Sequence, residues 1–151
     1  MIERIDHVNL VVNDMAAMIE FYRDVLGLRL TRQAVISGEW IDAVTGLPHV
    51  EAEVAFLEAS AGPAIELIRY RAPPGARPDR LGVSNTQGFR HIAFRVRDID
   101  RLTAAMRGAG VEFISQIQQV PPTQVDYADV RKSLLYCRDP EGNLLELCAF
   151  E

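Results

Sequence analysis

The chain has 151 residues, a net charge of −5, and 48% hydrophobic and 25% charged residues. This balance predicts one globular domain and excludes disorder as the main state. The sequence contains no run of about 18 apolar residues, so it predicts no membrane span. Acidic residues outnumber basic ones by 21 to 16, which disfavours binding to a phosphate backbone, so we expect neither a nucleic-acid nor a membrane partner. Charges at Glu3, Arg4 and Asp6 argue against a signal peptide, and two cysteines, Cys137 and Cys148, predict reduced thiols in a cytoplasmic protein.

In chain order, the first half shows strand and helix patterns in turn. Alternation over residues 4–12 predicts a strand. Apolar residues at helical spacing over 15–26 predict a helix, with Asn13 or Asp14 as its N-cap and Gly27 as its stop. Three more strands are predicted, at residues 28–36, 54–57 and 64–70.

The second half shows the same order of patterns. A strand is predicted at 91–96, followed by a helix that begins at Asp98 and ends at Gly108 or Gly110. Further strands are predicted at residues 111–117, 133–137 and 144–150. The last two are joined by a turn sequence, residues 139–143, rich in Asp, Pro, Gly and Asn.

The two halves are similar in sequence. Residues 6–15 align with 90–99, and residues 64–67 align with 144–147. We therefore predict a single α+β domain over 1–151, built from two tandem βαβββ modules that form a cupped mixed sheet. Module one covers 1–71, a Pro- and Gly-containing linker covers 72–87, and module two covers 88–151.

Two connections are long, and both are predicted to be loops. They cover residues 37–53 and 118–132. Long loops in compact domains are often functional, so we predict that Trp40 and Tyr127 close an apolar wall over a substrate. Ordinary surface packing is the alternative for both side chains.

Each half supplies one histidine from its first strand and one glutamate from its last: His7, Glu66, His91 and Glu146. If a pseudo-twofold axis relates the halves, all four can point into one cavity. Two imidazoles and two carboxylates suit one divalent ion, namely Zn, Ni, Co, Fe or Mn. A single strand histidine is more often a surface or core residue, and a glutamate in an apolar strand can simply face solvent. The repetition weakens both of these interpretations.

Six segments in this order resemble the vicinal oxygen chelate superfamily, which includes glyoxalase I, methylmalonyl-CoA epimerase, extradiol dioxygenases and resistance proteins of the bleomycin and fosfomycin types. The segments are residues 5–8, 21–28, 54–57, 65–67, 91–94 and 139–147. The resemblance is closest to the glyoxalase I and epimerase members. It implies two βαβββ modules around one metal, with ligands at His7, Glu66, His91 and Glu146, and a homodimer.

The resemblance also implies a reaction. In the isomerases and lyases of the family, the metal chelates an enolate while a proton moves beside a carbonyl, and a carboxylate moves the proton. Glu146 and Glu66 are the candidates for that catalytic role, acting on a small-molecule substrate. The ligand set resembles that of bacterial metal-dependent glyoxalase I, whereas the epimerases usually have glutamine where this chain has Glu66.

Several alternatives remain open. Extradiol dioxygenases use two histidines and one carboxylate, so the second carboxylate counts against that chemistry. Resistance proteins that bind a drug without catalysis usually lack the metal ligands. The epimerases have a further catalytic glutamate shortly before the strand at 54–57, where the candidates here are Glu51, Glu53 and His49. Arginines that could bind the carboxylates of glutathione, as glyoxalase I requires, are Arg23, Arg69 and Arg71; a solvated surface position is the alternative for each.

Overall fold

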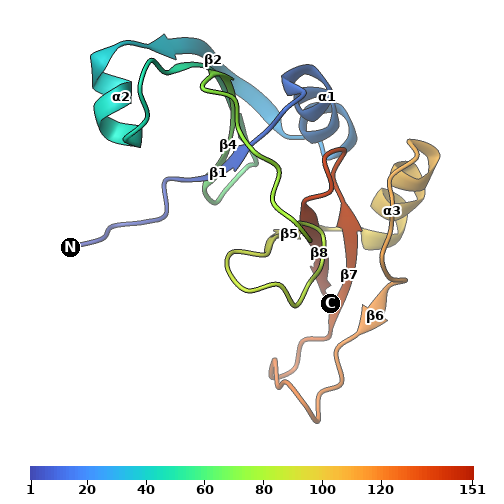
Figure 1. Ribbon diagram of the computed structural model, residues 1–151. Coiled ribbons are helices and arrows are strands. Elements are labelled where there is room, and N and C mark those ends of the chain that lie inside the picture. The colour runs from blue at the N-terminus through green and yellow to red at the C-terminus, as the bar shows by residue number, and fades with distance from the viewer. The chain divides into compact units, whose positions relative to one another are not determined.

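The computed structural model describes residues 1–151, which divide into two compact units, Met1–Arg77 and Pro78–Glu151 (Figure 1). Each unit contains one four-stranded mixed sheet with the same strand order. The predicted α+β class, with two modules of the βαβββ type, is therefore confirmed. No helix is both long enough and apolar enough to cross a membrane.

Unit 1 follows the predicted order, with one additional helix. Its elements are β1 (His7–Val11), α1 (Met15–Glu20), a π-helical turn η1 (Phe21–Val25), β2 (Arg29–Ser37), α2 (Glu39–Thr45), β3 (Glu51–Glu58) and β4 (Ala64–Ala72). The sheet order is β1-β4-β3-β2, with β1 parallel to β4 and the other pairs antiparallel. Asp14, one of the two N-caps that the sequence predicted, caps α1 by accepting a hydrogen bond from the Ala17 backbone.

Unit 2 repeats this arrangement. Its elements are β5 (His91–Arg95), α3 (Ile99–Gly108), β6 (Gln118–Gln119), β7 (Lys132–Arg138) and β8 (Leu144–Phe150). The sheet order is β5-β8-β7-β6, again with the first pair parallel. Asp98 caps α3 through the Arg101 backbone N–H, at 2.9 Å.

The predicted strand at 111–117 is wrong. This segment has one isolated bridge, Phe113 to Cys137, and the edge strand of the sheet is the two-residue β6. Pairing starts late because the backbone of Ile114 and Ser115 converges on one carbonyl, that of Tyr136. Two donors on one acceptor interrupt the alternating bonds of an antiparallel ladder.

The segment 37–53 is not simply a loop. It contains α2, which begins after Gly38 and ends at Gly46, and both glycines have positive φ. The helix buries Ile41 against the sheet residues Ala52, Val54 and Ile68 and against Val50, which precedes β3. A seven-residue helix spans about two turns, which is too short for a helical period to stand out in the sequence.

The two faces of the unit 1 sheet carry different residues. Helix α1 packs against β3 and β4 and buries Met15, Met18 and Ile19. Because side chains alternate along a strand, the residues of β4 that share a parity with Glu66 lie on the other face, the one that α2 covers in part. The candidate residues of unit 1 therefore lie away from α1.

Candidate metal centre

In unit 1, His7 and Glu66 lie on neighbouring parallel strands and face each other. The His7 Nε2 is 3.4 Å from the Glu66 Oε2. The same carboxylate oxygen accepts a hydrogen bond of 2.7 Å from the side-chain amide of Asn9, which is the residue paired with Glu66 in the sheet. On its other side, His7 Nδ1 is 3.0 Å from a carboxylate oxygen of Asp6.

The contact with Asp6 determines what His7 presents to Glu66. A carboxylate accepts a hydrogen bond, so the ring proton lies on Nδ1 and the lone pair of a neutral ring lies on Nε2. The hydrogen bond to His7 lowers the pKa of Asp6, which therefore stays ionised at neutral pH. A carboxylate behind the imidazole in this way is typical of histidines that bind metals.

In unit 2, His91 and Glu146 have the same relation. The His91 Nε2 is also 3.4 Å from the Glu146 Oε2. His91 pairs with Leu144, two residues before the glutamate, just as His7 pairs with Ala64. Glu146 is the more buried glutamate, with a side chain 7% exposed against 17% for Glu66. The two pairs thus stand at the same register in two copies of one sheet.

An aromatic ring accompanies each pair. The residue paired with Glu66 on β3 is Phe56, whose ring meets that of His7 edge-on at 5.9 Å. The residue paired with Glu146 on β7 is Tyr136, whose ring lies 5.3 Å from that of His91. Burial raises the pKa of Tyr136, and the charge of Glu146 raises it further, so this phenol stays protonated at neutral pH.

Glu146 forms an ion pair with a lysine, whereas Glu66 forms none with a lysine or an arginine. The Lys132 Nζ is 3.0 Å from the Glu146 Oε1, and the lysine side chain is 16% exposed. Burial alone lowers the pKa of Lys132, but the adjacent charged carboxylate of Glu146 more than offsets this, and the pKa is raised. Lys132 is therefore a charged ammonium at neutral pH.

The donor atoms fit a divalent ion. An Nε2–Oε2 separation of 3.4 Å is long for a charge-assisted hydrogen bond. Two donors that each lie about 2.1 Å from one ion are separated by roughly 3.0–3.4 Å. The structure shows no group of three or more His, Cys, Asp or Glu side chains arranged to hold an ion; each unit by itself brings together two of the candidate ligands.

Other candidates from the sequence lie elsewhere in unit 1. Glu53 forms ion pairs with Arg69, at 3.6 Å, and with Arg71. Arg69 and Glu53 are paired across β3 and β4, at the strand positions that alternate with Glu66, so they lie on the opposite face. Glu51 also pairs with Arg71. Neither glutamate adjoins the His7–Glu66 pair.

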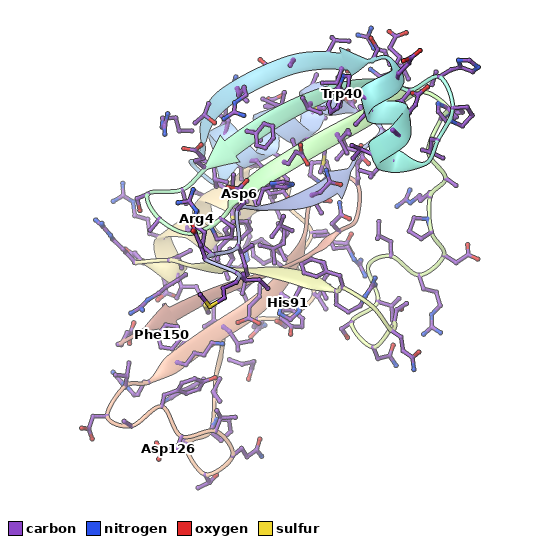
Figure 2. All side chains as sticks on the ribbon, turned by 90° about the vertical axis from the view of Figure 1, so that its left-hand side faces the viewer. Arg4, Asp6, Trp40, His91, Asp126 and Phe150 are labelled. Atoms are coloured by element: carbon purple, nitrogen blue, oxygen red, sulfur yellow. The ribbon has the colours of Figure 1, made fainter.

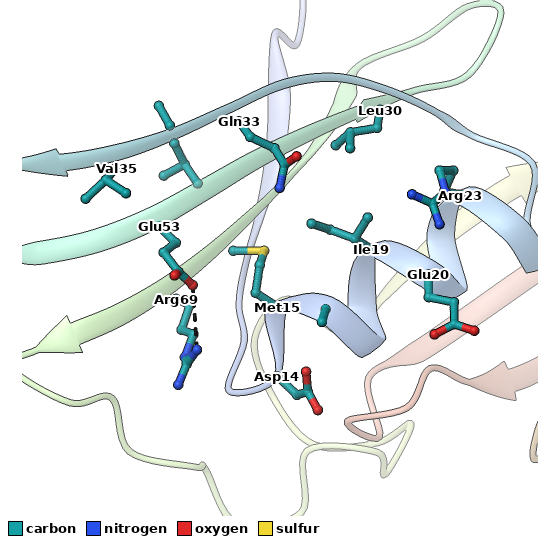
Figure 3. A pocket seen from close by; sticks show the side chains of 13 residues that line it. Asp14, Met15, Ile19, Glu20, Arg23, Leu30, Gln33, Val35, Glu53 and Arg69 are labelled. Carbon is teal, nitrogen blue, oxygen red and sulfur yellow. Dashed lines mark ion pairs between the residues drawn. The ribbon is translucent and has the colours of Figure 1, made fainter.

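A groove of about 760 Å³ lies on that opposite face, between α1 and the strands β2 and β3 (Figure 3). Glu53, Arg69 and Arg23 line it, and the ion pair of Glu53 with Arg69 is at one side. Arg23 also forms an ion pair with its neighbour Asp24. The groove therefore collects two of the predicted arginines, without either of the predicted metal ligands of this unit. His49 follows α2 and is exposed, with its backbone N–H held by Asp42.

The two aromatic residues of the predicted lids have different surroundings. Trp40 lies on α2 and is 58% exposed (Figure 2). The ring of Tyr127 meets that of Phe150 edge-on at 5.7 Å and is 5.7 Å from the Lys132 Nζ. The segment 118–132 therefore adjoins the His91–Glu146 pair through Lys132.

Three residues that adjoin the candidate ligands were not found from the sequence: Asp6, Asn9 and Lys132. The predicted strand at 133–137 begins one residue too late to include Lys132, although alternation from Tyr136 places it on the face of Glu146. Asn9 follows His7 by two residues in the first strand, which also signals a shared face.

The arrangement matches a known group of proteins. The family model of the Glyoxalase/Bleomycin resistance protein/Dioxygenase superfamily matches residues 4–147. The chain belongs to this superfamily. The resemblance seen in the sequence is thereby confirmed at the level of the superfamily.

Several members are similar over nearly the whole chain. The uncharacterised protein YaeR of Escherichia coli is 30% identical over 97% of this chain and 95% of its own length. A 2-epi-5-epi-valiolone epimerase from an Actinomyces species is 27% identical over 95% of this chain and 77% of its own length. A glyoxalase family protein from Bacillus cereus is 30% identical, with a TM-score of 0.85 over 99% of this chain and 95% of that one. The trypanothione-dependent glyoxalase I of Leishmania major shares the fold, at 21% identity and a TM-score of 0.67 over 97% of this chain and 86% of that one.

Proposed function

We propose that this superfamily member is a metal-dependent lyase or isomerase, of the glyoxalase I or epimerase type, that moves a proton beside the carbonyl of a small molecule. The observation that carries the proposal is the repeated His–Glu pair, with Nε2 and Oε2 3.4 Å apart in both units. Both glutamates interrupt otherwise apolar stretches of their strands, which a core role without a partner does not explain.

The residues that would hold the ion are His7, Glu66, His91 and Glu146. Zn, Ni, Co, Fe and Mn all accept imidazole and carboxylate ligands. When bound, the ion supplies Lewis-acid stabilisation for negative charge on substrate oxygens, as in an enolate.

The protein's own groups prepare the site and move the proton. Asp6 holds His7 in the tautomer whose Nε2 lone pair faces Glu66, and Asn9 orients Glu66 by donating to its Oε2. Glu146 is the proposed proton carrier, because a carboxylate beside the reacting carbon can act as a general base. Glu66 is the second candidate for that role.

The relatives support this choice of chemistry without fixing the substrate. One relative is named as an epimerase and one structural neighbour as a glyoxalase I. The second carboxylate weighs against the extradiol dioxygenase alternative, which uses two histidines and one carboxylate. Possession of both His–Glu pairs weighs against a drug-binding protein without catalysis.

The test is proton exchange into deuterated water, followed by NMR at the carbon beside the carbonyl. Protein freed of metal and then loaded with each candidate ion is incubated with a panel of small ketones and glutathione hemithioacetals. We expect exchange with at least one ion, and loss of that exchange in His91→Ala. Oxygen uptake with catechols and Fe(II), or tight binding of an unchanged small molecule without exchange, would contradict the proposal.

A further inference from the structure

Lys132 is a half-buried cation that forms an ion pair with Glu146. Its side chain is 16% exposed, and its ammonium is 3.0 Å from Glu146 and 5.7 Å from the rings of Tyr127 and Phe150. Taking an ammonium out of water is unfavourable, and a buried ion pair seldom adds stability beyond what an apolar pair would give. A half-buried lysine beside a proposed metal ligand therefore calls for an explanation other than stability.

The duplicated sheet provides an internal comparison. In β3, Ala52 lies four residues before Phe56, as Lys132 lies four residues before Tyr136 in β7. Ala52 is fully buried in an apolar cluster and pairs with Tyr70, as Lys132 pairs with Phe150. The same position in the same kind of sheet thus accepts a small apolar residue.

The comparison also shows that the two glutamates are held differently. Glu66 is held through Oε2 alone, by the neutral amide of Asn9. Glu146 directs Oε2 toward His91, and its Oε1 forms an ion pair with the Lys132 ammonium at 3.0 Å but accepts no hydrogen bond. Only Glu146 therefore has a cation beside it that can compete with a second cation for the same carboxylate.

We propose that Lys132 is a positioning residue that competes with the bound divalent ion for Glu146, so that Glu146 is the ligand held less tightly and free to carry a proton. The proposal rests on the proposed function, because it needs an ion at the His–Glu pairs. The Lys132 ammonium lies beside Oε1, whereas Oε2 faces His91 and would be the ligating oxygen, and the positive charge of Lys132 repels a cation at Oε2.

The repulsion gives the proposal a distinctive sign. If Lys132 only held Glu146 in place, its removal would weaken metal binding, as the loss of groups that orient ligands usually does. If it competes with the ion, removal of its charge tightens metal binding and slows release of the ion. The sign of the change separates a competing role from a merely structural one.

The experiment measures Co²⁺ affinity by competition with a chelator, and Co²⁺ release by stopped flow, on the full chain. Lys132→Met removes the charge and keeps an unbranched side chain, Lys132→Gln removes the charge and keeps a donor, and Lys132→Arg keeps the charge. Arg95→Met is the matched control: Arg95 is another cation of this sheet, 4.6 Å from the Phe150 ring, and makes no ion pair with Glu146. Lys132→Gln is a second neutral variant in case Lys132→Met does not fold, and circular dichroism checks the folding of each variant.

We expect Lys132→Met and Lys132→Gln to bind Co²⁺ roughly tenfold more tightly, a modest share of the repulsion between two nearby cations, while Lys132→Arg and Arg95→Met resemble the wild type. Equal or weaker binding in both neutral variants would overturn the inference. An equal gain in Co²⁺ affinity in Arg95→Met would also overturn it, because the gain would then come from the loss of any positive charge on this sheet and not from Lys132 in particular. If the wild type binds Co²⁺ no better than His91→Ala, the proposed function itself fails.

Discussion

At the scale of single residues, the two glutamates differ in their neighbours although their backbones are equivalent. Glu66 accepts from the Asn9 amide, whereas Glu146 is paired with the Lys132 ammonium and is the more buried. Two carboxylates in unlike surroundings favour different roles in one reaction. We therefore expect substitution of the two to have unequal effects.

Glu146→Gln should lower turnover by about 10²–10⁴-fold, the usual contribution of a positioned acid or base, while metal content falls less. Glutamine keeps the size and one neutral oxygen ligand but cannot take the proton. Glu66→Gln should be milder. Exchange rate and metal content are measured together, with metal resupplied, and Glu58→Gln, which removes a surface ion pair with Arg29, is the control. Full turnover in Glu146→Gln would end the assignment of Glu146 as the base, and a parallel loss of turnover and metal would leave it only a ligand.

Cys137 makes the stability of the protein sensitive to high pH. Burial, with a smaller contribution from the charge of Asp139, raises the pKa of this thiol to about 12. An unfolded thiol ionises near pH 8.5–9, so the folded state holds the proton more tightly. The contribution of this thiol to the free energy of unfolding is fully present below about pH 9. Above that pH we expect the free energy of unfolding to fall by up to roughly 1.4 kcal/mol per pH unit.

Urea unfolding of the wild type and Cys137→Ala at pH 7, 9 and 10.5 measures this effect. The variant loses packing at every pH, so the comparison is between the pH slopes and not between the absolute free energies. The slope above pH 9 should be shallower in Cys137→Ala. Equal slopes would show that the thiol does not contribute.

At the scale of elements, the turn before β8 organises the strand that carries Glu146. The buried carboxylate of Asp139 accepts hydrogen bonds from the backbone of Glu141 and Asn143, at 3.0 and 2.9 Å, and from the Asn143 side chain at 2.7 Å. Asp139→Ala leaves these donors without their partner, so we expect a loss of about 3 kcal/mol in unfolding free energy.

Urea unfolding at neutral pH measures the change in Asp139→Ala. Asp98→Ala is the comparison, because it removes a single helix cap and should cost only about 1 kcal/mol. A loss in Asp139→Ala no larger than that in Asp98→Ala would show that the turn is held by its backbone alone.

Elements with a clear period or cap could be predicted from the sequence. Apolar patterns predicted the strands that carry His7 and Glu66, and Asp14 and Asp98 marked the starts of two helices. The short helix α2 could not be predicted, because two turns held by glycines at both ends give too little pattern. The register that makes β6 so short depends on bonds to the Tyr136 carbonyl, which no local pattern encodes.

At the scale of the whole molecule, the repeat was the most informative signal for the candidate site. It aligned His7 with His91 and Glu66 with Glu146, and the two sheets show the same register for both pairs. Lys132 could not be found this way, because the other unit has alanine at the matching position. Comparison of the two halves thus finds residues that occur at matching positions in both, and it misses a residue that only one half contains.

The proposed function requires the two units to act on one ion, and this has a stoichiometric consequence. Each unit supplies one histidine and one glutamate, and two ligands bind a divalent ion weakly, whereas four are the usual number for a firmly held zinc ion. We therefore expect one ion per chain, measured by elemental analysis and native mass spectrometry. The same result is expected if the protein is the proposed homodimer, whichever copy supplies each pair, and light scattering gives the number of chains.

Substitution of one histidine in each unit tests whether the pairs act together. If they share an ion, His7→Ala and His91→Ala should each remove most of the bound metal, and the double variant should lose little more, because residues that serve one site are not additive. If each pair held its own ion, the wild type would contain two ions per chain and each single variant would keep one. His49→Ala, a change of the third histidine on an exposed segment after α2, should keep the full ion content. Two ions per chain, or additive losses, would contradict a shared site and with it the proposal that both units build one catalytic centre.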